Sequence, residues 1–329
     1  MTRPYVRITG TGHAVPAYAM QNADFAAIGI DTDDAWIRNR TGIGQRYICR
    51  DGETCVSLAA EASQQAMADA GVTAEEIDVI VFGTCSPDKQ LPASGVELQA
   101  RLGAKLAAAF DVNAACTSFV YGLSVGEGFI AAGSAKTVLV VGAEKLSGVI
   151  NWKDRNTCVL FGDGAGAAVL QPSDGTRGII SRFMRSDGNL ASLLYRPRGG
   201  SAEPVTPEML LDGSYYVNMA GRETFKHAVY SMNEALDHAL SDAGLTGDDI
   251  DLLIPHQANL RIIEATARHG NISMDKVFVN VDRYGNTSAA SVPIALDECM
   301  RSGRVKPGMT VMMVAFGAGF TWASAIHRY

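Results

Sequence analysis

The sequence DAGVTAEEIDVIV at residues 69–81 returns as DAGLTGDDIDLLI at residues 242–254, 173 positions later. Each copy is typical of an amphipathic helix closed by a C-cap glycine, followed by a short acidic turn and a buried strand. A second pair of apolar runs, TVLVVG at residues 137–142 and TVMMVA at residues 310–315, has the same offset and is typical of central strands. We therefore expect an α/β fold made of two duplicated halves.

The boundary between the halves is expected in the turn-forming sequence QPSDG at residues 171–175. It divides the chain into an N-terminal half, residues 1–172, and a C-terminal half, residues 173–329. A first strand is expected at residues 5–9, directly at the start of the chain. Residues 187–212 are rich in Gly, Pro, Arg and Glu without periodicity, which predicts a long surface loop that could line a pocket.

Composition restricts the class of protein. The 329 residues are 47% hydrophobic and 19% charged, which suits an enzyme-sized globular protein with a large core. The net charge of −7 argues against a nucleic-acid partner, because phosphate binding needs a basic surface. No apolar run approaches the length of a membrane helix, and the N-terminus lacks the pattern of a signal peptide. We expect a soluble cytoplasmic protein without a membrane partner.

Cys116 stands out among six scattered cysteines, which include no Cys-x-x-Cys pair and no metal-ligand spacing. It lies where a strand-like run gives way to an apolar helix. If that helix starts near Cys116, its N–H groups and positive dipole end would stabilise a thiolate, the nucleophilic form of cysteine. The alternative is a packing role, because an intracellular cysteine in apolar surroundings is most often a small buried hydrophobe.

His256 and Asn286 are the candidate partners of Cys116. His256 follows the repeated strand of the second half, at the position that Gly83 has in the first, and Asn286 pairs with Cys116 at an offset of 170. Because ligand sites collect at the carboxyl ends of parallel strands, packing of the halves could bring these turns together. A thiolate with two neutral hydrogen-bond donors suits thioester chemistry. Taken singly, a structural histidine and a helix-capping asparagine remain alternatives.

Two glycine-rich stretches complete the pattern. FGDGAGAA at residues 161–168 lacks the spacing of a dinucleotide fingerprint and the Lys-Ser/Thr of a P-loop, so we expect it to serve close packing between the halves. FGAGF at residues 316–320 follows the last buried strand, where a backbone N–H could approach a substrate carbonyl as an oxyanion hole.

Four motifs together resemble the β-ketoacyl-acyl-carrier-protein synthase III family of the thiolase superfamily: NAAC at 113–116, PHQAN at 255–259, GNTS at 285–288 and FGAGFTW at 316–322. The similarity runs from the first strand to Tyr329. It implies a thiolase-like αβαβα five-layer fold, a homodimer, and initiation of fatty-acid biosynthesis without a metal or redox cofactor.

The resemblance also implies a two-step reaction. Cys116 attacks an acyl-CoA primer and becomes an acyl-thioester. Malonyl-acyl-carrier protein then loses CO₂, His256 and Asn286 stabilise the resulting enolate, and the enolate attacks the acyl-Cys. The N–H groups of Cys116 and Ala318 form the oxyanion hole.

Further residues are carried over from the family for the substrates. The CoA adenine would be bound by Trp36, Arg40 and Arg155, although Trp36 could also be a core residue. The acidic carrier protein would be met by Lys226, Arg261 and Arg268, with His269 as a further candidate. The acyl pocket would involve Leu91 and Phe316.

Three positions depart from the family pattern and leave the substrate open. Leu91 replaces a Phe that reaches the partner's acyl pocket, Ala318 replaces a Gly, and Arg222 replaces an Asn near the tunnel. Loss of the ring could admit primers longer than acetyl. A secondary-metabolism relative with another primer or acceptor therefore stays an alternative, as does a non-catalytic CoA-binding scaffold. A non-decarboxylating thiolase is disfavoured, because Cys299 does not lie in that branch's second cysteine motif.

Overall fold

The computed structural model describes residues 6–173 and 175–329. Tyr5, expected in the first strand, and Asp174, expected in the boundary between the halves, lie outside the described residues. The first strand, β1, spans Val6–Ala14. The assignment of two domains divided after residue 172 stays a prediction, although β7 ends at Pro172 and β8 starts at Gly178.

Two sheets with matching topology form the framework. The first has the order β1-β7-β6-β4-β5 and the second the order β8-β13-β12-β11, so equivalent strands take equivalent places. In both, the repeated strand pairs in parallel with the central strand, which is antiparallel to the next one. The remaining strands of the first sheet are β4 (Val79–Gly83), β5 (Ala108–Val112), β6 (Val138–Glu144) and β7 (Gly164–Pro172). The second sheet consists of β8 (Gly178–Ser186), β11 (Leu252–Pro255), β12 (Thr310–Gly317) and β13 (Thr321–Arg328).

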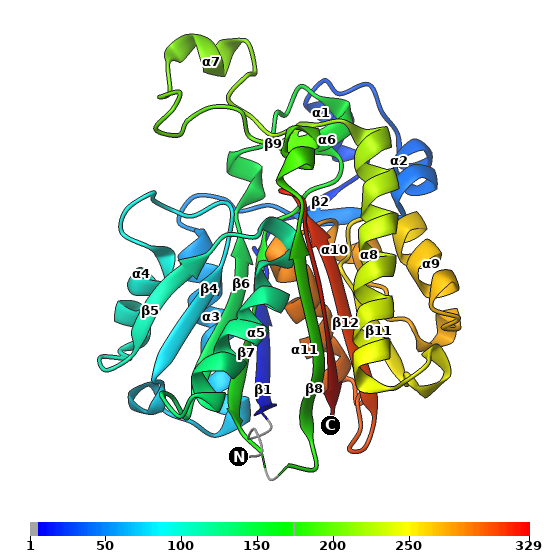
Figure 1. Ribbon diagram of the computed structural model, residues 1–329. Helices are drawn as coiled ribbons and strands as arrows, with labels where there is room; N and C mark the ends of the chain where they lie inside the picture. The colour runs from blue at the N-terminus through cyan, green and yellow to red at the C-terminus, as the bar shows by residue number, and fades with distance from the viewer. Residues whose placement is uncertain (1–5, 174) are drawn as a thin grey trace.

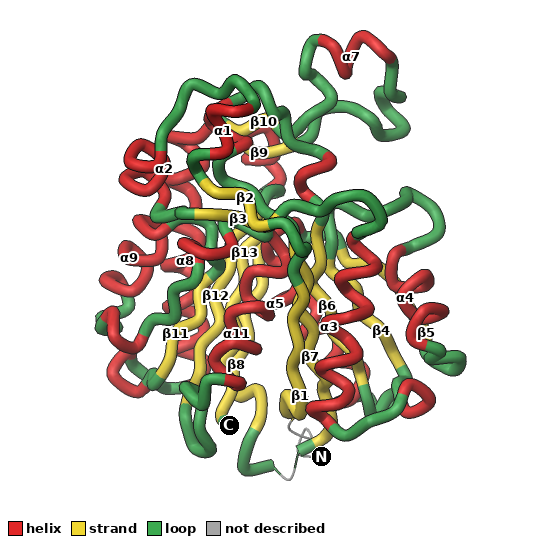
Figure 2. The backbone as a smooth tube through the Cα atoms, turned by 180° about the vertical axis from the view of Figure 1, so that it is seen from behind, coloured by secondary structure: helices red, strands yellow, loops and turns green. Residues whose placement is uncertain are grey.

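Helices form three layers around the two sheets (Figures 1 and 2). Between the sheets lie α5 (Ser118–Ala131) and α11 (Ser291–Arg301), which contact strands of both. The outer face of the first sheet is covered by α3 (Cys55–Ala70), with α4 (Ser94–Leu102) beside it. The outer side of the second sheet carries α8 (Gly221–Ala243) and α9 (Leu260–His269). The predicted five-layered αβαβα arrangement is therefore confirmed.

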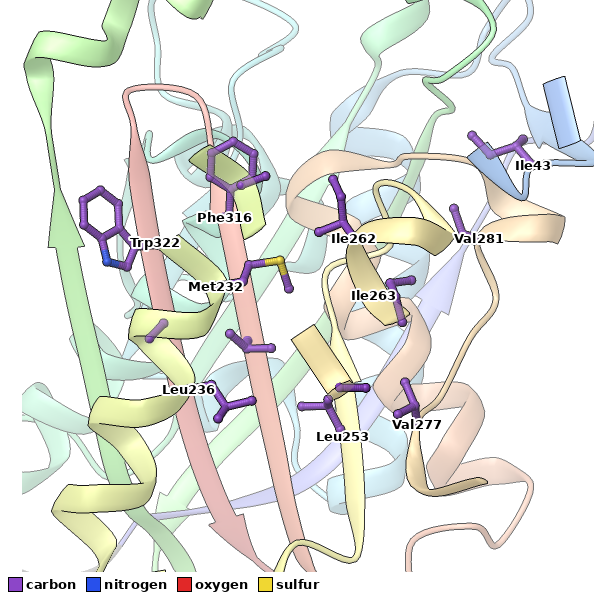
Figure 3. Packing of buried hydrophobic residues seen from close by; sticks show 14 of the residues in the cluster. Ile43, Met232, Leu236, Leu253, Ile262, Ile263, Val277, Val281, Phe316 and Trp322 are labelled. Carbon is purple, nitrogen blue, oxygen red and sulfur yellow. The ribbon is translucent and has the colours of Figure 1, made fainter. Parts of the chain in front are cut away.

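The central strands explain why their sequences are continuous apolar runs. Along β12, Val311 and Met313 enter the core between the sheets, while Met312 and Val314 enter the core beneath α8. Because successive side chains of a strand point to opposite faces, a strand covered by helices on both sides must be apolar at every position. Figure 3 shows the core beneath α8, where Met232 of that helix lies among the buried side chains.

Shorter elements complete the chain. The helices are α1 (Asp24–Ala27), α2 (Asp34–Thr41), α6 (Arg155–Cys158), α7 (Pro207–Leu211) and α10 (Val281–Tyr284). The strands are β2 (Ala19–Gln21), β3 (Gln45–Tyr47), β9 (Leu194–Tyr195) and β10 (Asn218–Met219). The 3₁₀ helices are η1 (Ala74–Glu76), η2 (Ala115–Thr117), η3 (Leu146–Gly148), η4 (Gly188–Leu193), η5 (Gly247–Asp249), η6 (Met274–Lys276) and η7 (Ser288–Ala290). The region 187–212, predicted to be a loop, thus contains η4, β9 and α7, the last at the end of a protrusion in Figure 1.

The duplication keeps one register through the turns before α5 and α11. These helices begin at Ser118 and Ser291, and the residues that open η2 and η7, Ala115 and Ser288, have φ of 48° and 50°. The offset in these turns is therefore 173, as in the repeated strands. The predicted pairing of Cys116 with Asn286, at an offset of 170, is therefore wrong by three residues.

The glycine-rich stretch at residues 161–168 packs one half against the other. A Cβ added at Gly166 would lie 2.7 Å from the Cβ of Pro293 and 2.8 Å from the backbone N of Ile294. Since real Cβ contacts are longer, only glycine lets β7 approach α11 this closely. This confirms that the stretch serves close packing between the halves.

Candidate active site

Elements of both halves meet around Cys116. Cys116 lies in η2, and a Cβ on Gly317 at the end of β12 would be 2.7 Å from its backbone N. The neighbouring hydroxyl of Ser288, in η7, lowers the pKa of the Cys116 thiol. The turns η2 and η7 and the end of β12 therefore meet at Cys116.

A cavity of about 600 Å³ opens beside this sulfur. Its wall includes Cys116, Ser288, Ala318, Cys85, Asn113 and Phe161, together with Ala191, Leu194, Tyr195, Arg196, Arg198, Gly199 and Gly200 from the region 187–212. That region was expected to line a pocket, and it does. Of the sequence-predicted site residues, the cavity brings together Cys116 and Ala318.

The environment of Cys116 opposes ionisation of its thiol. Burial raises its pKa to about 12, and the negative charge of Glu144 also raises it, against the lowering by Ser288. The helix α5 begins two residues after Cys116, at Ser118. Burial therefore opposes the thiolate that a helix end would favour, and the predicted thiolate stays a prediction.

His256 is a neutral hydrogen-bond donor. It follows β11 and is 1% exposed, and this burial lowers its pKa to about 3. Its Nδ1 lies 2.6 Å from Oγ of Ser291, while the N–H of Gln257 points to the same Oγ at 3.4 Å. Among the hydrogen bonds of the described residues, Nδ1 is the one acceptor that the Ser291 hydroxyl has, so its proton is assigned to Nδ1 and the ring proton to Nε2.

Asn286 is held by both its backbone and its side chain. Its N–H donates to the carbonyl of Leu160 at 2.8 Å, and its carbonyl accepts from Gly162 at 3.0 Å. Its Oδ1 accepts the N–H of Ser288 at 2.9 Å. With Oδ1 occupied, the amide NH₂ is the end that can donate to a ligand.

His256 and Asn286 are both buried and lie outside the described cavity wall. Asn286 adjoins the wall through Ser288 and through Phe161, with which it forms an isolated β-bridge. His256 is anchored to Ser291 at the first turn of α11.

Trp36, Arg40 and Arg155 form one cluster. The guanidinium carbons of Arg40 and Arg155 lie 4.3 Å and 4.7 Å from the centre of the Trp36 ring. Arg155 also donates to the carbonyl of Asp31 at 2.6 Å. Trp36 is half-buried, so it packs on the core and also presents a surface on which a planar base could stack.

The basic side chains predicted for carrier-protein docking lie on two adjacent helices. Lys226 is exposed on α8, and Arg261 and Arg268 are exposed near the two ends of α9. Arg222, which replaces an Asn of the family near the tunnel, is exposed at the start of α8. The neighbouring His269 pairs with Asp237 at 2.9 Å.

The basic surface adjoins the tryptophan cluster. The N-cap residue of α9, Asn259, donates to the carbonyl of Arg40 at 3.0 Å. The two predicted binding surfaces are therefore neighbours.

The two predicted acyl-pocket residues do not line the described cavity. Leu91 is 87% exposed. Phe316 is buried beneath the end of β12, where its ring packs edge-to-face on Phe320 with the centroids 4.9 Å apart.

Sequence reasoning missed Glu144, Ser288 and Ser291. The duplication contained a signal for the first of them, because Glu144 corresponds to Gly317 at the offset of 173, as His256 corresponds to Gly83. In each pair a polar residue in one half stands where the other half has glycine.

No group of three or more His, Cys, Asp or Glu side chains suited to a metal ion occurs within residues 6–173 and 175–329. In the same part of the chain, no helix combines the length and the apolar character needed to cross a membrane.

Comparisons with known proteins agree with this geometry. Residues 110–188 match the family 3-oxoacyl-[acyl-carrier-protein (ACP)] synthase III, and residues 240–329 match its C-terminal family. The β-ketoacyl-[acyl-carrier-protein] synthase III of Roseiflexus sp. (strain RS-1) is 50% identical over 325 residues, covering 99% of this chain and 98% of the relative.

Solved structures are similar over nearly their whole length. The crystal structure of 3-oxoacyl-[acyl-carrier-protein] synthase III from Aquifex aeolicus VF5 has a TM-score of 0.91 and 44% identity, covering 98% of this chain and 100% of that one. The priming β-ketosynthase of the R1128 polyketide biosynthetic pathway has a TM-score of 0.91 and 36% identity, covering 99% and 97%. The fold and the site define a condensing enzyme of the thiolase fold that transfers acyl groups. Within that class, the chain belongs to the β-ketoacyl-[acyl-carrier-protein] synthase III family.

Proposed function

We propose that the protein joins an acyl-CoA primer to malonyl-acyl-carrier protein through an acyl-Cys116 intermediate and so initiates fatty-acid biosynthesis. The observation that carries the proposal is the buried Cys116 thiol at the wall of a cavity where elements of both halves meet. The reaction lengthens the primer by two carbons and uses no metal or redox cofactor.

In the first step the Cys116 sulfur attacks the thioester carbonyl of acyl-CoA, and the bond to the CoA sulfur breaks. The oxyanion formed in between needs preorganised donors in a site shielded from water. The backbone N–H groups of Cys116 and Ala318 are assigned this role, which is supported by the close approach of Gly317 to the Cys116 backbone.

In the second step malonyl-acyl-carrier protein loses CO₂, and the enolate attacks the acyl-Cys. Negative charge develops on the thioester oxygen of the malonyl group. His256 and Asn286 are assigned to hold that oxygen by hydrogen bonds. A neutral imidazole with its proton on Nε2 and a free amide end on Asn286 support this assignment.

The substrates are assigned to the two neighbouring surfaces. The adenine of CoA stacks at Trp36, Arg40 and Arg155, and the acidic carrier protein binds at Lys226, Arg261 and Arg268. Acyl-CoA and malonyl-acyl-carrier protein each carry their acyl group as a thioester at the end of a flexible arm. Binding sites for the two substrates that lie next to each other would let both arms reach the same cavity. The enzyme is further proposed to work as a cytoplasmic homodimer. A second copy covers Leu91, which is 87% exposed in the single chain, and Leu91 limits the acyl chain from across that interface. Sedimentation of the full chain tests the dimer.

Mass spectrometry tests the nucleophile and the primer together. We expect incubation with acetyl-, isobutyryl- and octanoyl-CoA to add the mass of the acyl group to the peptide that contains Cys116. Cys116→Ala should lose the adduct and the condensation, while Cys49→Ala, another cysteine change, should retain both. A Cys116→Ala protein that folds and still condenses would refute the mechanism. The best primer in this series separates an acetyl-primed enzyme from one that starts a secondary-metabolism chain.

A charge reversal tests the docking surface. Arg261→Glu should raise the KM for malonyl-acyl-carrier protein about tenfold, as expected for loss of roughly 1.4 kcal/mol of attraction, with little change in self-acylation by acyl-CoA. Lys306→Glu, in an exposed loop before β12, is the matched reversal and should leave both rates unchanged. Equal loss of both activities in Arg261→Glu would refute the docking assignment.

A further inference from the structure

Arg46, in the short strand β3, is a completely buried cation. Among the ion pairs of the described residues, none includes Arg46. Neutral groups surround its guanidinium instead. Nη1 donates to Oδ1 of Asn22 at 2.8 Å and to the carbonyl of Met20 at 3.4 Å, and Nη2 donates to the carbonyl of Val159 at 2.7 Å. The guanidinium carbon lies 4.8 Å from the centre of the Phe25 ring, and Nε has no hydrogen-bond partner among the described residues.

Filling space does not explain an arginine at this position. A buried charge costs free energy even when its donors are paired, and an apolar side chain of similar volume often fills such a space as well. Burial lowers the pKa of Arg46 to about 10, which leaves the guanidinium charged at neutral pH. What a guanidinium offers over an apolar side chain is several donors in one rigid plane. The elements that these donors connect therefore indicate the role of the residue.

The first connection leads through Asn22 to α2, the helix that carries Trp36. Asn22 is 2% exposed, and its Nδ2 donates to Oδ1 of Asp34 at 2.8 Å and to the carbonyl of Ile43 at 2.8 Å. Asp34 is the first residue of α2, and Ile43 follows the C-cap residue of the same helix. Because Oδ1 of Asn22 accepts from Arg46, a flipped amide would turn its own donors towards the guanidinium. Arg46 therefore fixes the amide that holds both ends of α2.

The second connection leads to α6, the helix that carries Arg155. Val159, whose carbonyl accepts from Nη2 of Arg46, is the C-cap residue of α6, and Arg155 is the first residue of that helix. The guanidinium carbon of Arg155 lies 4.7 Å from the centre of the Trp36 ring. Arg46 thus bonds, directly or through Asn22, to the two helices whose side chains meet at this ring.

The segment after α6 also borders a catalytic turn. The carbonyl of Leu160 accepts the N–H of Asn286 at 2.8 Å, next to the carbonyl that Arg46 binds. Loss of Arg46 could therefore act on Asn286 as well as on the adenine site. The two effects fall on different steps, because Asn286 is assigned to the malonyl group and adenine belongs to the acyl-CoA that acylates Cys116.

We propose that Arg46 is a positioning residue that preforms the adenine site for CoA. Its guanidinium sets the distance between α2 and α6, and thereby the relative position of Trp36 and Arg155. The inference rests on the proposed CoA site and adds to it a residue that does not touch the ligand, because Arg46 is 0% exposed. A site that is ordered before binding loses less conformational freedom when the ligand arrives. Preformation therefore increases the affinity for the nucleotide without taking part in the chemistry at Cys116.

The test compares two acyl donors that differ in the nucleotide. Acetyl-CoA and acetyl-pantetheine carry the same thioester, but acetyl-pantetheine has no adenine. Mass spectrometry of the Cys116 peptide gives the second-order rate constant of acylation with each donor, and their ratio measures what the nucleotide contributes. Arg46→Met should lower this ratio about tenfold, which corresponds to roughly 1.4 kcal/mol of binding free energy, through a slower reaction with acetyl-CoA alone. Arg46→Lys keeps the charge without the planar donors and should lower the ratio too, whereas simple attraction of the CoA phosphates would preserve it.

Three further variants separate positioning from general stability. Asn22→Ala removes the connection to α2 but leaves Arg46 and its bond to Val159, so it should also lower the ratio, by less than Arg46→Met. Thr11→Val is the control, because it breaks a buried hydrogen bond of 2.7 Å to Asp297 from β1 and should leave the ratio unchanged. Arg46→Met combined with Arg155→Ala should give the ratio of Arg155→Ala alone, because both changes act on one stacking site.

The outcomes are distinguishable. Equal slowing with both donors in Arg46→Met and Asn22→Ala would show a purely structural role and overturn the proposal, as would an unchanged ratio in both while Arg155→Ala lowers it. If Arg46→Met does not fold, Asn22→Ala decides. A ratio that Arg155→Ala leaves unchanged would instead overturn the adenine site of the proposed function.

Binding of CoA itself, measured by calorimetry, needs no reaction at Cys116. It should weaken about tenfold in Arg46→Met and stay unchanged in Thr11→Val. This result would support the proposal even if acetyl-CoA failed to label Cys116, a failure that would refute the acyl-transfer mechanism.

Discussion

Ser291→Ala is expected to slow decarboxylation of the malonyl group and leave acylation of Cys116 nearly unchanged. The hydroxyl of Ser291 lies 2.6 Å from Nδ1 of His256, and both residues are at most 2% exposed. In the variant, Nδ1 loses its donor, so the imidazole no longer has a bond that keeps its proton on Nε2. The proton on Nε2, which stabilises the enolate oxygen, is then present on that atom for only part of the time.

The magnitude follows from the loss of this bond. A buried hydrogen bond between neutral groups contributes about 1 kcal/mol, and an unpaired buried acceptor costs about 1–3 kcal/mol. If about 1–2 kcal/mol of this loss falls on the transition state, decarboxylation becomes roughly 5- to 30-fold slower. The KM for malonyl-acyl-carrier protein should change little, because docking takes place on α8 and α9.

The assay measures two rates on the same protein. Release of labelled CO₂ from malonyl-acyl-carrier protein reports the second step, and the rate of mass gain on Cys116 with acyl-CoA reports the first. Ser324→Ala is the matched control, because Ser324 is fully buried and its hydroxyl also donates at 2.6 Å, to the carbonyl of Ala235. Equal slowing of both steps in Ser291→Ala, or slowing of neither, would refute the assignment of His256 to decarboxylation.

Three further predictions concern binding and stability. Arg155→Ala should raise the KM for acyl-CoA about tenfold at an unchanged rate of condensation, measured with saturating malonyl-acyl-carrier protein; an unchanged KM would contradict the adenine site. Gly166→Ala should lower the free energy of unfolding, measured by urea denaturation, by about 1–3 kcal/mol, because its Cβ would collide with Pro293. An unchanged free energy of unfolding would show that β7 and α11 can move apart at this point. Burial lowers the pKa values of both His256 and His327 to about 3, below the unfolded value near 6.5. The unfolded chain then binds more protons between these limits, so the free energy of unfolding should fall as the pH drops from about 6.5 towards 3, and a flat urea-denaturation profile over that range would contradict it.

The fold was predictable because the duplication is visible as sequence. The repeat at residues 69–81 and 242–254 carries a helix end, a turn and a strand, and the structure gives β4 and β11 equivalent places in their sheets. The apolar runs of β6 and β12 followed from burial on both faces. The register of the turns before α5 and α11 could not be predicted. Ala115 and Ser288 adopt a positive φ without being glycine, and residue type does not reveal such a conformation.

The candidate site was only partly accessible from sequence. The resemblance to a family supplied Trp36 and Arg155, which stand far apart in the chain and meet at one ring. The protonation state of Cys116 could not be predicted, because its environment depends on Glu144 and Ser288, which tertiary packing brings together. Position before a helix favours a thiolate, whereas burial raises the pKa of the thiol to about 12.

The duplication also explains how a symmetric framework holds an asymmetric site. At the ends of the equivalent strands, Gly83 stands opposite His256 in the repeat, and Gly317 stands opposite Glu144. A Cβ on Gly83 would be 2.7 Å from the Cβ of Ser118, and one on Gly317 would be 2.7 Å from the Cys116 N, so each glycine makes room for the turn that carries the nucleophile.

The polar member of each pair is buried near this turn: His256 is assigned to the enolate, and Glu144 accepts a hydrogen bond from Ser288 at 2.9 Å. Divergence at two equivalent strand ends therefore brings different polar groups to one region on a duplicated framework.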